Sequence, residues 1–209
     1  MKITTIGLDI AKTVFHLFAV SKTGRLVKKK QLKRNQVLPF MANLEPCLIA
    51  MEACGGAHYW AREFEALGHQ VKLIAPQYVK PFVKGNKNDY NDAEAIAEAA
   101  QRPTMRFVPN KSVEQQDVQN FHRQRERIKK ERTALANQVR GLLAEYGIVI
   151  HKGIRTVSKS LPNILEDAEN GLTPLTRELF AELYDELQAL NERFAQCEQR
   201  INVINQSHE

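Results

Sequence analysis

The sequence predicts a mixed α/β fold followed by a long helical region with coiled-coil character. Three short apolar segments, residues 3–10, 47–51 and 71–75, have the composition of buried strands. A helical segment separates the second from the third, and this strand–helix–strand order favours parallel pairing. Further along the chain, apolar residues recur with heptad spacing. We therefore expect a sheet domain over residues 1–110 and a helical coiled-coil region over residues 111–209.

The first strand opens an antiparallel meander. Residues 13–20 continue with strand composition, residues 22–25 make a tight turn, and residues 25–32 return as a lysine-rich strand. Two hairpins therefore join the first three strands of the sheet.

Helices flank these strands and fill the connections. Residues 36–44 and 57–67 predict two helices, each ended by a proline or glycine soon afterwards. Residues 92–101 predict a third, Ala-rich helix. Residues 105–108 are either a short strand or an extended connector, and the sheet domain ends after them.

Two apolar seams mark the helical region, and we expect a glycine- and proline-containing loop between them. The first seam repeats every seven residues and ends near Tyr146. It comprises Phe121, Ile128, Leu135 and Leu142. The second has alternating spacings of four and three and comprises Leu183, Leu187, Leu190, Phe194, Cys197, Ile201 and Ile204. The sequence leaves two interpretations open: antiparallel packing within one chain, or pairing between chains in a homo-oligomer.

Positive charge is gathered in two segments of a chain whose net charge is +6. Residues 22–34 contain seven basic residues and no acidic one, and residues 111–140 contain eight basic and four acidic residues. Such clusters favour contact with a phosphate backbone, although a lysine-rich edge strand and a solvated helix face would also produce them. We favour nucleic acid because two separate clusters agree. The predicted contacts are Lys12, Lys28, Lys30, Lys87, Arg123, Arg125, Arg127 and Lys130.

The remaining composition excludes several classes of protein. With 43% hydrophobic and 26% charged residues, the chain has the composition of a globular protein. No apolar run approaches the ~18–20 residues that span a bilayer, and the N-terminus lacks the pattern of a signal peptide. Three cysteines without a Cys-x-x-Cys pair indicate neither a disulfide framework nor a zinc site. We expect a cytoplasmic protein without membrane contact.

Carboxylates stand at three of the predicted termini. Asp9 ends the first strand, Glu52 ends the second buried strand, and Asp89 and Asp92 stand three residues apart at the start of the Ala-rich helix. Residues at i and i+3 lie on one helix face. Acidic residues in a first helical turn are also ordinary capping chemistry, so the pair alone is weak evidence for a site. However, the carboxyl ends of strands are where open α/β sheets bind ligands.

Four carboxylates close together would need a cation to offset their repulsion. Hard divalent cations such as Mg²⁺ or Mn²⁺ prefer oxygen ligands. A pair of such ions can activate an attacking oxygen and stabilise a leaving one in phosphodiester chemistry. The sequence therefore predicts a metal-dependent site at Asp9, Glu52, Asp89 and Asp92 in a basic, nucleic-acid-binding protein.

Three sequence blocks carry these acids, and together they resemble a known family. The blocks are Gly7-Leu8-Asp9-Ile10-Ala11-Lys12, Met51-Glu52-Ala53-Cys54-Gly55 and Lys87-Asn88-Asp89-Tyr90-Asn91-Asp92-Ala93. In order and spacing they closely resemble those of DEDD insertion-sequence transposases, bacterial recombinases that use a bridge RNA. The resemblance covers residues 1–108 and implies an RNase H-like (RuvC-like) domain followed by a coiled coil. It further implies that the four acids are the metal-binding tetrad of a Mg²⁺-dependent, RNA-guided oligomer that exchanges DNA strands.

The resemblance is incomplete in one respect. The family has a further C-terminal domain that supplies a serine nucleophile, and this chain ends at Glu209 without a segment that resembles it. We therefore assign no nucleophile and expect the N-terminal portion of a transposase. Two other functions fit the same residues: a stand-alone Mg²⁺-dependent nuclease resembling junction resolvases, and a non-catalytic nucleic-acid-binding dimerisation module of a truncated element.

Overall fold

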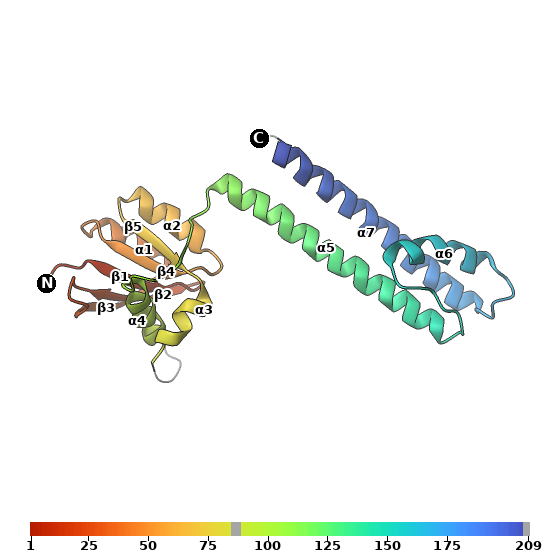
Figure 1. Cartoon of the computed structure of the whole chain (residues 1–209), viewed down its shortest axis with the longest axis horizontal. Helices are drawn as coiled ribbons and strands as arrows, with labels where there is room; N and C mark the ends of the chain where they lie inside the picture. Colours follow the sequence, from red (N-terminus) through yellow and green to blue (C-terminus); the bar gives the residue numbers. More distant parts are fainter. Residues whose placement is uncertain (85–88, 207–209) are drawn as a thin grey trace. The chain divides into compact units, whose positions relative to one another are not determined.

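The computed structural model describes residues 1–84 and 89–206 (Figure 1). It divides into two compact units, Met1–Ser112 and Val113–Glu209, and each is described by itself. Among the helices of the described residues, none is long and apolar enough to cross a membrane.

Six described strands of the first unit form one sheet in the order β3-β2-β1-β4-β5-β6. They are β1 (Thr5–Asp9), β2 (Val14–Val20), β3 (Leu26–Lys33), β4 (Leu48–Glu52), β5 (Gln70–Ile74) and β6 (Phe107–Val108). The β1–β2 and β2–β3 pairs are antiparallel, β1–β4 and β4–β5 are parallel, and β6 returns antiparallel to β5. This is the RNase H-like mixed sheet that the sequence predicts, and the segment at 105–108 contributes a short edge strand.

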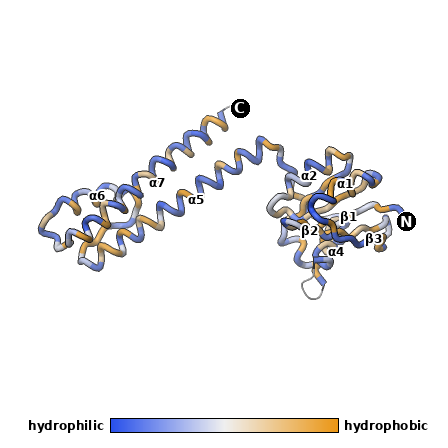
Figure 2. The backbone as a smooth tube through the Cα atoms, turned by 180° about the vertical axis from the view of Figure 1, so that it is seen from behind, coloured by the Kyte–Doolittle hydropathy of each residue, from blue (hydrophilic) through white to orange (hydrophobic). Residues whose placement is uncertain are grey.

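Helices cover both faces of this sheet. On one face, α1 (Arg34–Ala42) and α2 (Ala57–Ala66) cover a core that includes Phe15, Trp60 and Phe64. On the other face lies α4 (Asp89–Ala100), whose small side chains pack against β1 and β2. Two short elements, α3 (Pro76–Val79) and η1 (Lys80–Phe82), connect β5 toward α4 on that second face. Hydrophobic residues fill β1, β2 and β4, whereas β3 is rich in lysine, and Figure 2 colours the chain by hydropathy.

Helix α4 lies unusually close to β1 because of Gly7. A Cβ atom at this position would lie 2.1 Å from the backbone oxygen of Ala93 and 2.8 Å from the Cβ of Ala97. Such distances are far inside van der Waals contact, so a side chain at Gly7 would force the helix away from the sheet. The glycine of the first sequence block therefore sets the position of the helix that carries Asp89 and Asp92.

The second unit contains α5 (Val113–Ala144), α6 (Ile154–Glu166) and α7 (Pro174–Gln206). Contacts between α5 and α7 pair early residues of one with late residues of the other, as in the bond from Cys197 Sγ to the Phe121 carbonyl oxygen and that from Arg132 Nε to Asn191 Oδ1. The two helices are therefore antiparallel, and Figure 1 shows this pairing. Most of the second predicted seam is buried against the same chain.

Helix α6 corrects the expectation of a loop between the two long helices. Gly153 and Gly171 flank this helix, but Pro162 lies inside it. The segment has an apolar face at helical spacing, and Val157 and Leu161 are fully buried. Burial of this face outweighs the loss of one backbone N–H donor at the proline.

Candidate functional site

Asp9 and Glu52 lie side by side at the same edge of the sheet. Parallel pairing of β1 and β4 aligns Leu8 with Met51, so the next residues on the two strands are neighbours. Leu8 and Met51 point into the core beneath α1 and α2. Because successive side chains alternate between faces, Asp9 and Glu52 both point to the face covered by α4.

Helix α4 brings the other two acids to this place. It begins at Asp89, and both Asp89 and Asp92 belong to its first turn. One carboxylate oxygen from each of Asp9, Asp89 and Asp92 can be chosen so that all three lie within 4.8 Å of one another. Glu52 is outside this group, but its carboxylate interacts electrostatically with those of Asp92 and Asp9.

Burial and mutual repulsion shape the ionisation of the cluster. Burial, followed by the charges of Asp92 and Asp89, raises the pKa of Asp9 from 3.8 to about 6. Burial and the charge of Asp92 also raise the pKa of Glu52. Both shifts express the cost of holding several negative charges in one partly dehydrated place. A bound cation would remove that cost, and an all-oxygen donor set suits a hard divalent ion.

One residue of this site, His16, was not found from the sequence. It pairs directly with Asp9 across the antiparallel β1–β2 ladder, and only 9% of it is exposed. Its Nδ1 lies 3.6 Å from Asp89 Oδ2, and its ring packs edge-on against that of Tyr90 at 4.8 Å between centroids. The sequence predicts this hairpin but not its register, and it is the register that places His16 opposite Asp9.

The predicted nucleic-acid contacts of the sheet domain lie in different surroundings. Lys12 is exposed in the loop that follows β1. Lys28 and Lys30 place their ammonium groups 5.3 and 4.7 Å from the ring centroid of Phe40, on the α1 side. Lys29 points to the opposite face, where its Nζ lies 3.8 Å from Glu94 Oε2. Lys87 lies outside the described residues.

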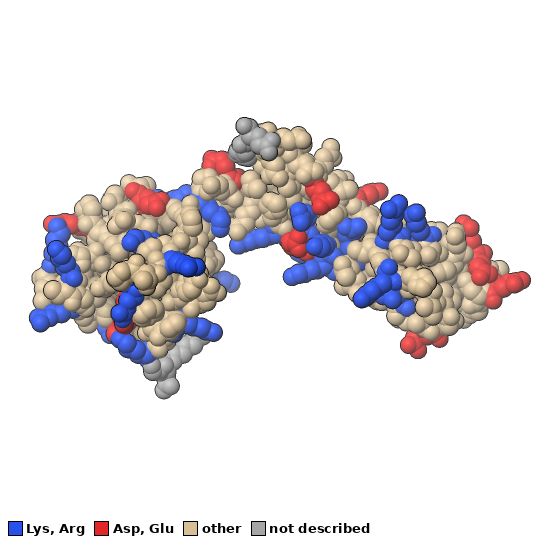
Figure 3. All heavy atoms as spheres, viewed as in Figure 1, with Lys and Arg blue, Asp and Glu red and all other residues tan. Residues whose placement is uncertain are grey.

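The predicted contacts of the helical unit all lie on α5. Arg123 and Lys130 are exposed and seven residues apart, so they share one helix face. Arg127 is paired with Glu131 on the same helix. Arg125 is half-buried, and its Nε has no hydrogen-bond partner among the described residues. Figure 3 shows Lys and Arg side chains gathered over the middle of this unit.

A match to a protein-family model identifies the family of the chain. Residues 6–148, more than half of the chain, match the model of the IS110-type DEDD transposase family, which is described as "Transposase". The chain belongs to the IS110-type DEDD transposase family. All four predicted acids fall inside the matched segment, as do α4 and the whole of α5.

Two curated transposases resemble the chain over nearly its full length. It is 52% identical over 204 residues to "Probable family 20 transposase" of Pseudomonas aeruginosa, covering 97% of the chain and 60% of that protein. It is 44% identical over 207 residues to "Transposase for insertion sequence element IS1111A" of Coxiella burnetii, covering 99% of the chain and 57% of that protein. The chain thus spans less than two thirds of the length of these curated relatives.

Solved structures show a weaker likeness. The structure of Thermus thermophilus RuvC aligns with a TM-score of 0.39 and 16% identity, over 50% of this chain and 99% of that one. The complex of T. thermophilus RuvC with a Holliday junction substrate aligns with a TM-score of 0.37 and 16% identity, over 51% and 99% of the two chains. The strand order and directions of the sheet, described above, define the fold independently of these alignments.

Proposed function

We propose that this chain is the metal- and nucleic-acid-binding portion of a DEDD transposase that acts in DNA transposition or recombination. Asp9, Glu52, Asp89 and Asp92 would hold Mg²⁺ or Mn²⁺. The observation that carries the proposal is the meeting of Asp9 with Asp89 and Asp92, whose ligand oxygens lie within 4.8 Å of one another. These residues come from separate sequence blocks of a transposase family member.

The donor set fits a hard divalent ion. The grouped residues offer only carboxylate oxygens, and burial together with the neighbouring carboxylates raises the pKa values of Asp9 and Glu52, a penalty that a bound cation would offset. When bound, the ions would activate an attacking oxygen and stabilise a leaving oxygen at a phosphodiester. The chain's own part is to fix the carboxylates: β1 and β4 hold one pair, and the contact of α4 with Gly7 positions the other.

Nucleic acid is the proposed partner. Lys12 follows Asp9 by three residues in an exposed loop, and Arg123 and Lys130 share an exposed face of α5. DNA is the substrate that a transposase requires, and a structured guide RNA is a second proposed partner. Each phosphate contact releases counterions, so affinity for either polymer should fall steeply with salt. A fluorescence-anisotropy series over increasing salt would measure this slope for each.

A homo-oligomer through the helical region is also part of the proposal. The seam of α7 is largely buried within the chain, so any pairing would use other surfaces. Leu175 and Leu179 supply exposed apolar surface near the start of α7, and Val203 near its end. Light scattering coupled to size-exclusion chromatography would show whether the chain assembles.

The metal site is tested by titrating the purified chain with Mn²⁺ in a calorimeter. Asp9→Asn and Asp92→Asn keep the size of each side chain but remove a negative charge, so both should lose binding and the thermal stabilisation that accompanies it. Glu94→Gln is the matched control, because Glu94 lies on α4 outside the grouped acids. Binding of Mn²⁺ by Asp9→Asn with wild-type affinity would refute the site.

A further inference from the structure

An open hollow of about 660 Å³ lies in the sheet domain, at the C-terminal end of α4. Its walls come from α3, from η1 and from residues 102–106 after α4. The side chains that matter are Tyr78 and Phe82, two arginines (Arg102 and Arg106), and Thr104. Among the described residues that line it, none is acidic. The volume is within the range of sites that bind a ligand the size of a nucleotide.

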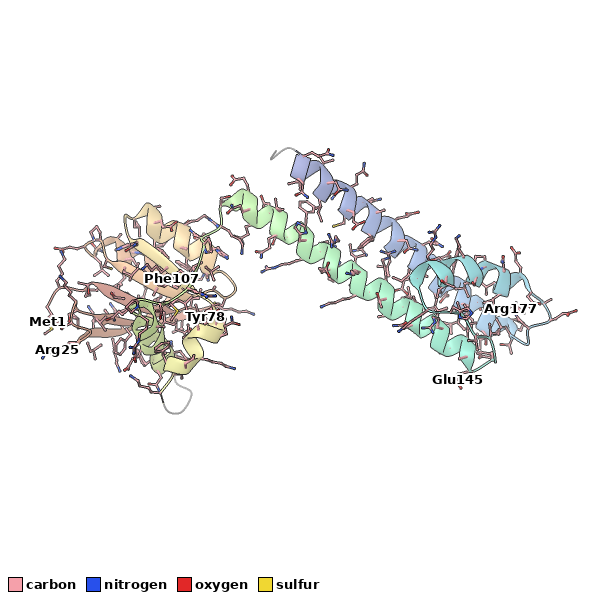
Figure 4. The ribbon with its side chains drawn as sticks, in the orientation of Figure 1. Met1, Arg25, Tyr78, Phe107, Glu145 and Arg177 are labelled. Atoms are coloured by element: carbon pink, nitrogen blue, oxygen red, sulfur yellow. The ribbon has the colours of Figure 1, made fainter. Side chains whose placement is uncertain are left out.

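Tyr78 offers an aromatic face on a rigid support. It is 37% exposed, and Figure 4 labels it on α3. Pro76 begins this short helix, and the backbone N–H of Tyr78 donates a 2.9 Å hydrogen bond to the Ala75 carbonyl oxygen. The neighbouring Val79 is buried in the core beneath α4 and anchors the helix. Because its backbone is fixed, Tyr78 can bind a planar group with little loss of conformational freedom.

The opposite wall is also fixed in place. Arg102 Nη2 donates a 2.7 Å hydrogen bond to Glu98 Oε1, and its guanidinium lies 5.3 Å from the ring centroid of Phe82. The turn after α4 is closed by the Met105 N–H, which donates to the Arg102 carbonyl oxygen at 3.1 Å. The Arg102 guanidinium therefore covers the ring of Phe82, whereas the side chain of Tyr78 remains partly exposed to solvent.

Positive charge completes the hollow. Arg106 is exposed at its rim, and Thr104 adds a hydroxyl that can donate to a phosphate oxygen. An exposed aromatic ring beside arginine is the combination that single-stranded nucleic acids require, because bases stack on the ring and phosphates pair with the cation.

We propose that this hollow binds one unpaired nucleotide of single-stranded DNA, with the base stacked on Tyr78 and its phosphate paired with Arg106. Helix α4 connects this position to the acidic site. Its 12 residues span about 18 Å, with the hollow at the C-terminal end and Asp89 and Asp92 at the N-terminal end. The inference rests on the proposed function and adds a nucleic-acid contact at the other end of α4 from Asp89 and Asp92.

The test is binding of a fluorescent oligothymidylate to the full chain in EDTA at low salt, so that metal binding plays no part. Tyr78→Ala should weaken binding about tenfold or more, and Tyr78→Phe should restore it, since stacking needs the ring and not the hydroxyl. Tyr59→Ala is the matched control, because Tyr59 is 40% exposed but lies on α2, which covers the other face of the sheet. Arg106→Gln should reduce the log–log salt slope by about 0.7.

Two further oligonucleotides make the outcome decisive. On a strand with abasic sites, wild type and Tyr78→Ala should bind equally, because the phosphates remain and the stacking partner is gone. The proposal is overturned if Tyr78→Ala matches Tyr59→Ala on intact DNA, or if it weakens binding of a matched RNA alone. Absence of any DNA binding by wild type would also overturn it. The proposed metal site is tested separately by the Mn²⁺ titration, so the two failures can be distinguished.

Discussion

Gly7 and Ala93 lie against each other so closely that a Cβ on the glycine would sit 2.1 Å from the Ala93 backbone oxygen. Asp9 follows Gly7 by two residues on β1, and Asp92 directly precedes Ala93 on α4. The contact between strand and helix therefore fixes the separation of two carboxylates of the candidate metal site.

Gly7→Ala should damage both stability and the site. The added methyl group has no space, so α4 must move away from β1, and such overpacking costs about 1–3 kcal/mol or more. Urea denaturation of the full chain would measure the loss in free energy of unfolding. Calorimetry should show weaker Mn²⁺ binding as well, because Asp92 moves with the helix.

Gly141→Ala is the control for this substitution. Gly141 lies inside α5, and a Cβ there would meet no atom within 4 Å. Alanine is the better helix former, so the variant should be more stable by about 0.5–1 kcal/mol. Equal effects of the two substitutions would contradict the steric explanation for Gly7.

The elevated pKa of Asp9 predicts how stability depends on pH. Its pKa rises from 3.8 to about 6 on folding, so the folded chain binds more protons than the unfolded chain between these values. The free energy of unfolding of the metal-free protein should therefore fall as pH rises through this window. Because the carboxylate is partly exposed, we expect a penalty of only about 1–2 kcal/mol at neutral pH.

Denaturation of wild type and Asp9→Asn in EDTA across pH 4–7 checks this window, which the Asp9 pKa values of 3.8 and about 6 define. Asp9→Asn should give a flatter profile and be the more stable of the two at neutral pH. Binding of Mn²⁺ by wild type should weaken below about pH 6, since a protonated Asp9 is a poor ligand. Parallel stability profiles for the two proteins would show that Asp9 is not the titrating group.

Much of this arrangement follows from patterns that the sequence displays. Asp9 and Glu52 each end a buried strand, and the structure pairs these two strands in parallel, so that both acids lie at one edge of the sheet. Asp89 and Asp92 begin a helix rich in alanine, which is small enough to lie directly on the sheet at Gly7. Local composition therefore indicated which acids stand at the ends of strands and helices, whereas the pairing of β1 with β4 that brings Asp9 beside Glu52 is a feature of the structure.

Other features depend on strand register and tertiary contacts, which local composition does not report. His16 reads as one residue of an apolar strand until the hairpin register places it opposite Asp9. Lys28 and Lys30 read as nucleic-acid contacts, but both also lie over Phe40 of α1. Helix α6 contains Pro162, which normally disfavours a helix. The apolar face of α6 is buried against α5 and α7, and this burial compensates for the proline.

His16→Phe should weaken metal binding without unfolding the domain. Phenylalanine keeps the edge-on packing against Tyr90 but removes the ring nitrogen that faces Asp89. Residues that orient metal-binding carboxylates typically contribute 10–100-fold to affinity, so we expect roughly a tenfold loss in Mn²⁺ titrations. His16→Asn restores a polar group near the Nδ1 position and should recover part of the affinity. Wild-type Mn²⁺ affinity in His16→Phe would exclude a positioning role.

Arg132 should stabilise the helical unit although it is a charged residue at the contact between α5 and α7. Its guanidinium lies 4.3 Å from the ring centroid of Phe194, and its Nε donates a 2.8 Å hydrogen bond to Asn191 Oδ1. Burial lowers the pKa of Arg132, yet these two contacts compensate for part of the lost hydration. Arg132→Ala removes both, while Asn191 keeps its 3.3 Å bond to Ser158 Oγ, so we expect a loss of about 1–2 kcal/mol.

Hydrogen exchange of the full chain measures this loss locally, because amide protection in α5 and α7 reports the opening free energy of the helical unit. Arg123→Ala, on an exposed face of the same helix, should change protection by less than about 0.5 kcal/mol. Arg132→Lys keeps the charge but loses the planar group that stacks on Phe194, so it should recover only part of the stability. If Arg132→Ala exchanges no faster than Arg123→Ala, the contacts with Phe194 and Asn191 contribute nothing and apolar burial alone holds α5 against α7.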